Sequence, residues 1–583
     1  MNDEHVDAAF TAAVQTALTG QVEAIINEGD GWGHLEHRQL AERILALVAY
    51  GRDGRLLDHA ARLATRLREL QGPSGLFAGG DNVDSPPDSA FSVNDLADAL
   101  WLLRHKPPGA PRGDRAAGHG PVDLLDPGAA EHGLVDLLDD LLTAVTPALT
   151  RGGVHTPNHR WEISAALARL HRLAPDRAPA ERVGQWLGEG VDIDDDGLYS
   201  ERSANYAAFV SNPSLLAIAE VFDRPDLVDA VERNLDATLD LLLPDGTVET
   251  VLSRRQDQRQ PLPLAPYLLP LRQIALLRGR GDLAWAAGLA LSQGIVSPAR
   301  AATELILDPG IGRELPEPVP PRRPRHRVFG AAGLLVDHRP ATTTVVFGGS
   351  DYPRHRRVRS GLANSPTFLR LFAGAAVLGD VRLSRVFFGL GPFRAARSLV
   401  ERDRGSTTAT LTESVSASYY QPMADQLRDA RGHYALVDDG RFSAAMDFGR
   451  RARDEVSLTT TVHVAITDAG AELTVDQEGA AVDWALELAF RPGGRMMGAL
   501  ALDEHSWQLD GGEPAVYRMA DDSITVTMIE SSMAASHAVP AYEPGEEYRF
   551  LGGTDAVSGE RLYVAGRVPG RVRLRLAADH HVG

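Results

Sequence analysis

Residues 313–327 read RELPEPVPPRRPRHR, and the chain changes its pattern across this stretch. Its five prolines cannot continue a helix, so we expect an extended linker here. Before the linker, apolar residues recur at spacings of three and four, as on one face of a helix. After it, they alternate, as in a strand. The sequence therefore predicts a helical domain over 1–312 and a β-domain over 328–583.

The helical half contains several amphipathic segments in succession. Leucines within 134–142 form one apolar stripe, and leucines within 235–242 form another. Thr156 and Pro157 place a capping residue before a proline, a pair that is typical of a helix start. Short loops join the segments. This pattern predicts helical hairpins, arranged either in an α/α toroid or in a solenoid.

The second half reads as short strands. The segments TTTVVF (342–347), VSLTTTVHVAIT (456–467), WALELAF (484–490) and VRLRL (572–576) carry the alternation and the β-branched residues that strands favour. Turn-forming Asp and Gly residues separate such segments. This half is long for one sandwich, so we expect a large antiparallel β-sandwich with several sheets.

The composition excludes several classes of function. The 583 residues include 59 Lys plus Arg and 79 Asp plus Glu, and the formal charge of −20 makes the chain a poor general binder of nucleic acid. Cysteine is absent, which excludes disulfides, thiolate nucleophiles and cysteine-ligated zinc. Lys106 is the single lysine, so nearly all positive charge is carried by arginine, whose planar fork binds carboxylates at two points.

Other features bear on location and cofactors. No stretch approaches the ~20 apolar residues of a membrane helix, so we expect no membrane partner. The N-terminus lacks the basic and apolar regions of a secretory signal, which favours a cytoplasmic protein, or a secreted one whose leader was removed. Phosphate-binding loops, His-Glu-x-x-His pairs and Gly-x-Ser-x-Gly elbows are absent. We expect no required cofactor; a structural divalent metal ion stays open, although no motif indicates one.

Residues 155–163, HTPNHRWEI, form the first candidate site. The Thr-Pro pair places Asn158, His159 and Trp161 in or beside the first turn of a helix. The free N–H groups and the dipole at that end favour a bound carboxylate. The alternative is structural, with Asn158 as a cap, His159 on the surface and Trp161 in the core.

Residues 194–206, DDDGLYSERSANY, form the second candidate site. The Asp-Gly run predicts a turn, and the glutamate of an EF-hand loop is not at the required position. Glu201 and Tyr206 are a candidate acid and base on a loop that leads into a helix starting near Asn212. The alternative is a solvated polar loop.

Residues 244–258 form the third candidate site. Arg254 and Arg255 stand beside Gln and Asp, and adjacent arginines can clamp a carboxylate. The alternative is a surface cluster of ion pairs.

Residues 350–364 form the fourth candidate site. His355 lies among four arginines, two of which are Arg357 and Arg359, and Asn364 follows them. In so acidic a chain, these arginines predict a local positive field. The alternative is an exposed basic loop.

The order of helical hairpins, proline-rich linker and large sandwich resembles the polysaccharide lyases with an α/α toroid and an antiparallel β-sandwich. The heparinase II/III-like group and the hyaluronan and chondroitin lyases are the closest comparison. The run 158–163 is similar to their Asn-Trp…Trp-Glu-Ile stretch, 196–206 to their Asp-Gly-Ser…His…Tyr segment, and 253–255 to their substrate-clamping Ser-Arg pattern. The stretch 360–379 is similar to the first sandwich strands of the heparinase II/III-like proteins. The resemblance implies an incomplete barrel of helical hairpins as the catalytic domain.

The resemblance also implies β-elimination on a glycan that contains uronic acid. Asn158, helped by Arg254 or Arg255, would neutralise the substrate carboxylate, and Tyr206 would act as base and acid. His159 is the alternative base, because an unperturbed imidazole has a pKa of about 6.5. Trp161 would stack on a sugar face. The remaining substrate-binding candidates are Glu201, Arg255, His355, Arg357, Arg359 and Asn364.

Two departures from the family pattern leave the base and the sugar open. Glu201 stands where the chondroitin-type pattern has His, and Asn364 stands where heparinase II/III-like proteins often have His. A glycoside hydrolase with paired carboxylates, drawn from Asp84, Asp88 and Glu201, is the rival enzyme. A non-catalytic carbohydrate-binding protein is the third alternative. In each case the expected partner is an anionic glycan or oligosaccharide, and the oligomeric state stays open.

Overall fold

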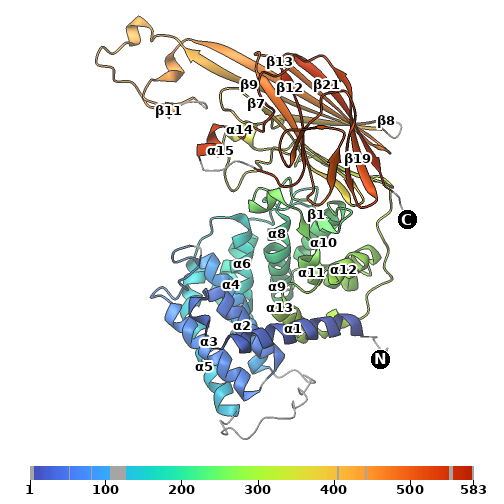
Figure 1. Ribbon diagram of the computed structural model, residues 1–583. Helices are drawn as coiled ribbons and strands as arrows, with labels where there is room; N and C mark the ends of the chain where they lie inside the picture. Colours follow the sequence, from blue (N-terminus) through green and yellow to red (C-terminus); the bar gives the residue numbers. More distant parts are fainter. Residues whose placement is uncertain are drawn as a thin grey trace. The chain divides into compact units, whose positions relative to one another are not determined.

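The chain forms two compact units, which we name the helical unit and the sandwich unit (Figure 1). The helical unit comprises Met1–Leu239 and Leu262–Pro321, and the sandwich unit comprises Asp240–Pro261 and Arg322–Gly583. The computed structural model describes residues 6–29, 31–51, 53–80, 82–105, 127–403, 406–439, 443–550 and 556–580. Lys106 lies outside these residues.

The helical unit is a ring of helical hairpins around a cavity. The cavity is lined by residues of α2 (His37–Tyr50), α4 (Pro86–Arg104), α6 (Pro157–Leu173), α9 (Asn212–Phe222), α11 (Leu268–Arg278) and α13 (Pro298–Leu307). These helices alternate along the chain with α1 (Ala8–Glu28), α3 (Gly54–Leu70), α5 (Pro127–Arg151), α7 (Arg177–Leu187), α10 (Pro225–Asp240) and α12 (Gly281–Ser292). Helix α13 packs against α1 and α2, which brings the last hairpin back to the first. The predicted α/α toroid is confirmed.

Local sequence signals explain where these helices begin and which face they bury. Thr156 stands at the N-cap of α6 and Pro157 occupies its first turn, as the sequence predicts. On α3, Leu57, Leu63 and Leu67 are all fully buried. Their spacing places them on one side of the helix, so the hydrophobic effect fixes the side that faces inward.

Tyr206 lies in a helix and not in a loop. Helix α8 (Ala204–Tyr206) continues through a π-helical turn, η2 (Ala207–Ser211), directly into α9. The helix begins early because the hydroxyl of Ser203 accepts a hydrogen bond from the backbone N–H of Tyr206 (3.1 Å) and so caps it. The prediction of a loop up to Asn212 is therefore wrong.

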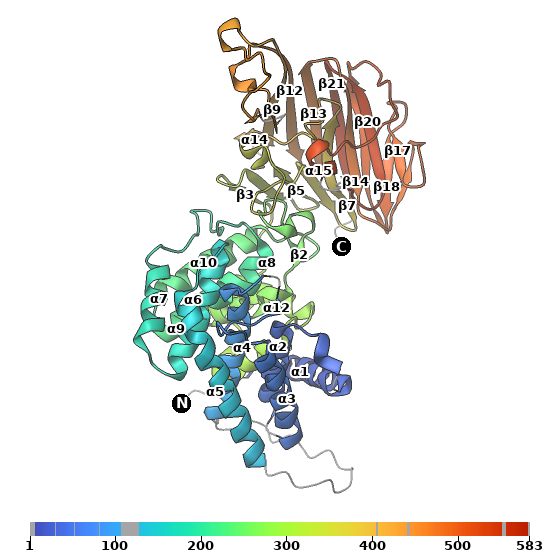
Figure 2. The same ribbon diagram turned by 90° about the vertical axis from the view of Figure 1, so that its left-hand side faces the viewer.

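Two sheets face each other in the sandwich unit (Figure 2). The first has the order β16-β17-β20-β14-β7-β6-β5-β4-β3, and its neighbours are antiparallel except for β17 and β20. Its strands are β3 (Arg325–Phe329), β4 (Leu334–His338), β5 (Thr343–Phe347), β6 (Leu369–Ala373), β7 (Ala376–Arg385), β14 (Asp483–Phe490), β16 (Leu500–Ala501), β17 (Ser506–Gln508) and β20 (Arg561–Arg567).

The second sheet has the order β15-β18-β19-β21-β13-β12-β9-β8 and is antiparallel throughout. One apolar core joins the sheets, with Leu371 and Leu486 from the first and Val462 and Leu574 from the second. Its strands are β8 (Arg397–Asp403), β9 (Ser406–Tyr420), β12 (Arg453–Thr467), β13 (Gly470–Gly479), β15 (Arg495–Met497), β18 (Ala515–Met519), β19 (Asp522–Ser531) and β21 (Gly570–Asp579).

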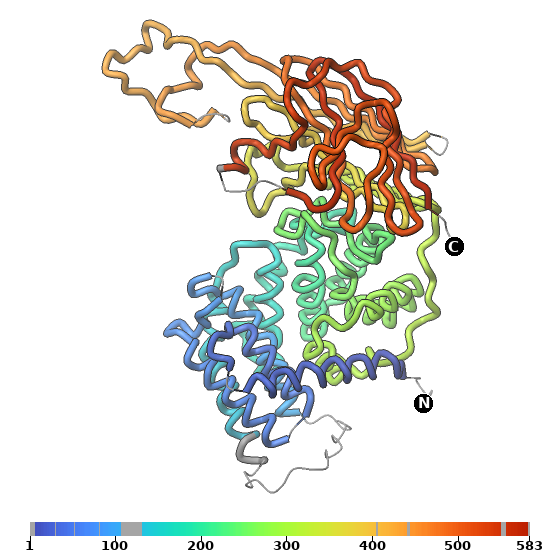
Figure 3. The backbone as a smooth tube through the Cα atoms, viewed as in Figure 1, coloured from blue at the N-terminus to red at the C-terminus, as the bar shows by residue number. Residues whose placement is uncertain are grey.

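The large antiparallel β-sandwich that the sequence predicts is confirmed. The four segments predicted as strands from their alternation correspond to β5, β12, β14 and β21. Between β9 and β12, residues 421–439 and 443–452 form an extension away from both sheets (Figure 3). No helix in the described part of the chain combines the length and the apolar composition needed to cross a bilayer.

The boundary between the units differs in two places from the predicted division. Strand β3 begins at Arg325, inside the predicted linker. The segment 240–261, which lies in the predicted helical domain, packs in the sandwich unit. A buried ion pair holds it there: Arg370 of β6 donates from Nη1 to Oε1 of Glu249 (2.8 Å). The same oxygen accepts the backbone N–H groups of Thr250 and Val251.

Replacing Arg370 by Met is expected to destabilise the sandwich unit by roughly 3–5 kcal/mol, because it leaves the charge of Glu249 buried without its partner. Hydrogen exchange should accelerate in β6 and in 248–252, and the urea midpoint of the β-sheet signal should fall. Arg571→Met is the matched control, because Arg571 pairs with Asp476 at a half-exposed position and such pairs contribute about 0–1 kcal/mol. Equal losses in the two variants would contradict the account.

Candidate functional site

The N-terminus of α6 already holds a carboxylate, that of Glu201. Asn158 donates to Oε2 of Glu201 from Nδ2 (2.5 Å) and from its backbone N–H (3.3 Å). Both residues are buried, with 1% and 7% of their surface exposed. The Oδ1 atom of Asn158 has no hydrogen-bond partner in the described part of the chain. The helix end therefore binds a carboxylate, as expected from its dipole, but the carboxylate belongs to the protein.

Two histidines flank this pair. The rings of His155 and His159 meet edge to face, with centroids 4.7 Å apart, and His159 is buried. Trp161 is 0% exposed, and its Nε1 donates to Oδ1 of Asp192 (3.0 Å). The guanidinium of Arg160 covers its ring at 4.6 Å. Trp161 thus packs inside the helical unit and offers no free face to a sugar, so the interpretation as core is the one the structure bears out.

A buried amide network anchors the segment that carries Glu201 and Tyr206. Asn212 accepts a hydrogen bond from the hydroxyl of Tyr199 (2.8 Å) and donates to Asn234 of α10 (3.0 Å). Asn234 in turn donates to the carbonyl of Gly197 (3.0 Å). Tyr206 is half-buried at the end of α8, where the π-helical turn begins. Such turns occur frequently at functional sites.

In the sandwich unit, residues 350–364 form an arginine-rich loop that includes α14 (Tyr352–His355). We name this segment the basic loop. The side chains of Arg354, His355, Arg356, Arg357 and Arg359 are exposed, and no ion pair joins them to other residues in the described ranges. They form a cationic surface on an acidic protein.

Asn364 ends the basic loop and is buried. Its Nδ2 donates to the carbonyls of Arg359 (2.7 Å) and Leu362 (3.0 Å), which fixes the turn. Its Oδ1 has no hydrogen-bond partner in the part of the chain that the structure describes. Asn364 therefore shapes the loop from inside and does not stand on its surface.

Arg254 and Arg255 also belong to the sandwich unit. The guanidinium of Arg254 donates to both carboxylate oxygens of Asp351, from Nε (2.9 Å) and Nη2 (3.2 Å). Arg255 is half-buried, and its backbone N–H donates to Oγ of Ser253 (3.0 Å). The predicted site residues thus fall into two groups. Asn158, His159, Trp161, Glu201 and Tyr206 are in the helical unit, and Arg254, Arg255, His355, Arg357, Arg359 and Asn364 are in the sandwich unit.

Asp84 and Asp88, two of the carboxylates proposed for hydrolysis, differ in exposure and in hydrogen-bond partners. Asp84 is exposed and accepts a hydrogen bond from Ser74. Asp88 is buried and pairs with Arg38 and Asn82. Burial alone would raise the pKa of Asp88, but the hydrogen bond from Asn82 and the charge of Arg38 outweigh it and hold that pKa below its ordinary value. A carboxyl with a lowered pKa is a poor general acid near neutral pH.

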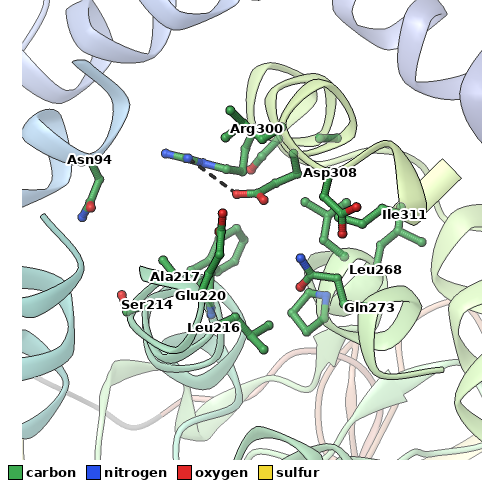
Figure 4. Close-up of a pocket in the computed structure, with 18 of the residues that line it drawn as sticks. Asn94, Ser214, Leu216, Ala217, Glu220, Leu268, Gln273, Arg300, Asp308 and Ile311 are labelled. Carbon is green, nitrogen blue, oxygen red and sulfur yellow. Dashed lines mark ion pairs between the residues drawn. The ribbon is translucent and has the colours of Figure 1, made fainter. Parts of the chain in front are cut away.

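A hollow inside the helical unit was not predicted from the sequence. It has a volume of about 920 Å³, within the range of small-molecule sites. Figure 4 shows Glu220 reaching into it from α9 and Arg300 from α13, with Asn94 and Ser214 at one side. Leu216, Leu268 and Ile311 supply apolar lining on the opposite side.

Paired charges line the polar side of this cavity. Glu162 of α6 accepts hydrogen bonds from Asn94 of α4 (2.7 Å) and from Ser214 of α9 (3.3 Å). Asp95 pairs with Arg300 of α13. The sequence does contain a signal of this polar lining: the run SVNDLADAL at 92–100 places polar residues in an otherwise apolar helix. Polar side chains at buried helical positions need partners, and here they find them on neighbouring helices.

Two carboxyls in this cavity keep their protons to unusually high pH. Burial raises the pKa of Glu162 to about 7, against the hydrogen bond from Asn94 and the charge of Arg169. Burial likewise raises the pKa of Asp95 to about 6, against the charge of Arg300. Acids that titrate near neutral pH can donate and accept protons under physiological conditions. Among the described residues, no group of three or more His, Asp or Glu side chains could hold a metal ion.

No protein-family model and no curated protein matches this chain. Several solved structures match this chain at low identity. A heparan sulfate lyase from Pedobacter heparinus is 11% identical, with a TM-score of 0.46 over 94% of this chain and 74% of that chain. Chondroitin AC lyase from Streptomyces coelicolor A3 in complex with chondroitin sulphate is 13% identical, with a TM-score of 0.42 over 93% and 73%.

A family 88 glycosyl hydrolase from Bacteroides vulgatus is 9% identical, with a TM-score of 0.31 over 53% of this chain and 90% of that chain. Lyases and hydrolases both occur among these similar structures. At such TM-scores, the similarity assigns no activity to this chain.

The raised pKa of Glu162 predicts a pH-dependent stability cost. The folded state favours the neutral acid, so Glu162 lowers stability progressively as pH rises from about 4.5 to about 7. Glu162→Gln removes this titration, so the variant should gain stability relative to the wild type over that interval, by up to about 3 kcal/mol. Urea unfolding at a series of pH values measures the difference.

Glu69→Gln, at an exposed position of α3, is the matched control for this measurement. A difference between Glu162→Gln and the wild type that stays constant from pH 4.5 to pH 8 would contradict the assignment of a neutral carboxyl in the cavity.

Proposed function

We propose that the protein is an enzyme that cleaves a uronate-containing glycan by β-elimination. The observation that carries the proposal is the exposed basic loop, whose arginines form no ion pair within the described residues although the chain carries a charge of −20. Exposed guanidinium groups bind carboxylate and sulfate groups well. An anionic polymer is therefore the substrate class that this surface favours.

The elimination needs three actions. The arginines of the basic loop, Arg357 and Arg359 first, neutralise the uronate carboxylate and so acidify its C5 proton. A base removes that proton, the C5–H electron pair forms the C4=C5 double bond, and the C4–O4 bond breaks. An acid then protonates the departing O4. Hydrogen bonds to the developing charge are strongest where water is excluded.

The base and the acid come from the group around the start of α6. His159 has the ring type that accepts protons near neutral pH, and Tyr206 carries a hydroxyl that can protonate the leaving oxygen. Oε2 of Glu201 accepts hydrogen bonds from Nδ2 and from the backbone N–H of Asn158, so the protein already supplies a carboxylate to this residue. We therefore assign Asn158 and Glu201 to the framework of this group, with neutralisation left to arginine.

Elimination is tested by ultraviolet absorbance during incubation with heparan sulfate, chondroitin sulphate and polygalacturonate. The unsaturated uronate product absorbs, whereas hydrolysis products do not. We expect absorbance to rise with at least one of these, and to rise about 10²-fold or more slowly in His159→Gln and in Tyr206→Phe, since each loses a proton-transfer group. Tyr50→Phe, at an exposed position of α2, is the matched control. Full activity in both site variants would contradict the assignment.

Hydrolysis is the second candidate, and the neutral carboxyl of Glu162 in the cavity favours it. A glycosidase needs one acid with a raised pKa and a second carboxylate, and Asp95 is also on the cavity wall. New reducing ends without absorbance, lost in Glu162→Gln, would support this reaction and retire elimination. Glycan binding without any cleavage would instead indicate a carbohydrate-binding protein.

A further inference from the structure

Asp351 closes the basic loop at its base. Its backbone N–H donates to the carbonyl of Ala363 (2.8 Å), and the backbone N–H of Ala363 donates to its Oδ2 (2.9 Å). Its carbonyl accepts the N–H groups of Arg354 (3.2 Å) and His355 (3.1 Å), which starts the turn of α14. Main chain and side chain of one residue thus bring the two ends of the loop together, as in a compact Ω-loop.

The same carboxylate fastens the basic loop to a second loop, 253–259. Arg254 meets Asp351 with a two-point ion pair, and the carbonyl of Arg254 accepts the N–H of Gly361 (2.8 Å). Oε1 of Gln258 accepts the N–H of Asn364 (2.8 Å). These contacts join segments about a hundred residues apart in sequence. The tip of the loop is held separately, because the N–H of Val358 donates to Glu547 of α15 (Glu546–Phe550).

The negative charge of Asp351 separates two effects that this residue can have on anion binding, one through the electrostatic field and one through the shape of the loop. A carboxylate beside five exposed basic side chains weakens the positive field that an anionic ligand would meet. Its presence there cannot strengthen anion binding through charge. It can strengthen binding only by holding the backbone in a shape in which the arginines face the ligand together, which reduces the entropy lost on binding.

We propose that Asp351 is a positioning residue that acts through Arg254 and Ala363 to hold the basic loop in its anion-binding form. The inference rests on the proposed function, because it takes the loop as the surface that binds the anionic glycan. In this account Arg254 belongs to the framework, whereas Arg357 and Arg359 contact the ligand.

The charge effect and the positioning effect have opposite signs in Asp351→Asn. Removal of a negative charge alone would tighten the binding of a polyanion. Loss of the positioning contacts would weaken it, by on the order of tenfold if a charge-assisted hydrogen-bond pair is lost. The measurement is the dissociation constant of a fluorescein-labelled heparin oligosaccharide for the full-length protein, by anisotropy at two salt concentrations.

Asp476→Asn is the matched control, because Asp476 makes a two-point pair with Arg571 in the same unit (2.6 and 3.1 Å) but lies outside both loops. It removes the same charge and should leave binding unchanged or slightly tighter. Arg254→Lys provides a second variant that keeps the charge and loses the planar fork. It should weaken binding several-fold, with the thermal midpoint as a check of folding. Asp351→Glu, which keeps the carboxylate, should restore part of the affinity lost in Asp351→Asn.

Tighter binding by Asp351→Asn, or unchanged binding by Arg254→Lys, would overturn the inference. So would a wild-type protein that does not bind the heparin oligosaccharide even at low salt. A failure of the proposed function would give a different combination of binding and activity results. Binding that weakens in Asp351→Asn, without elimination of any glycan tested, would leave the positioning role in place and remove the lyase assignment.

Discussion

Asp98 of α4 is fully buried and accepts hydrogen bonds from three arginines, Arg169 and Arg172 of α6 and Arg300 of α13. Burial alone would raise the pKa of Asp98, but these charges outweigh it and lower that pKa to about 2. A buried charge that loses its partners destabilises a protein strongly, so this one contact fixes the mutual positions of three helices of the ring. Glu162 and Asp95, which line the polar side of the cavity, lie on two of these helices, α6 and α4. Apolar packing between neighbouring helices and the buried ion pairs among α4, α6 and α13 thus both stabilise the ring.

The two groups of candidate residues share one principle. In the helical unit, an internal carboxylate, Glu201, binds the amide of Asn158; in the sandwich unit, another, Asp351, binds the guanidinium of Arg254. Both donors are those that the resemblance to lyases assigns to the substrate carboxylate. Both are instead satisfied by the protein, because a buried or half-buried donor without a partner is costly. The exposed arginines of the basic loop form no ion pair in the part of the chain that the structure describes, and we therefore propose them as the groups that recognise an anion.

The fold could be predicted from the sequence because its signals are local. Periodicity of three to four marks α3 and alternation marks β12, and the Thr-Pro pair marks the start of α6. The candidate site was predicted only in part, because its decisive contacts are not local. Arg254 and Asp351 are 97 residues apart, and Glu249 and Arg370 are 121 apart. No spacing rule links such pairs, so neither the assignment of 240–261 to the sandwich nor the tether of the basic loop could be predicted. The cap by Ser203 was a local signal that was missed, and with it the helix that carries Tyr206.

The preference for arginine over lysine follows from the same geometry. One carboxylate that binds three cations, as Asp98 does, or one cation that binds two oxygens, as Arg254 does, requires planar, multiply donating groups. A lysine ammonium is more strongly hydrated and lacks the fork, so it would be desolvated at greater cost in the helical ring and would hold the loops less rigidly. The use of arginine is therefore a requirement of the fold before it is a sign of the substrate. Arg357 and Arg359 differ in that their exposed guanidinium groups form no ion pair with any residue that the structure describes, which is why we propose them, and not Arg254, as ligands of an external anion.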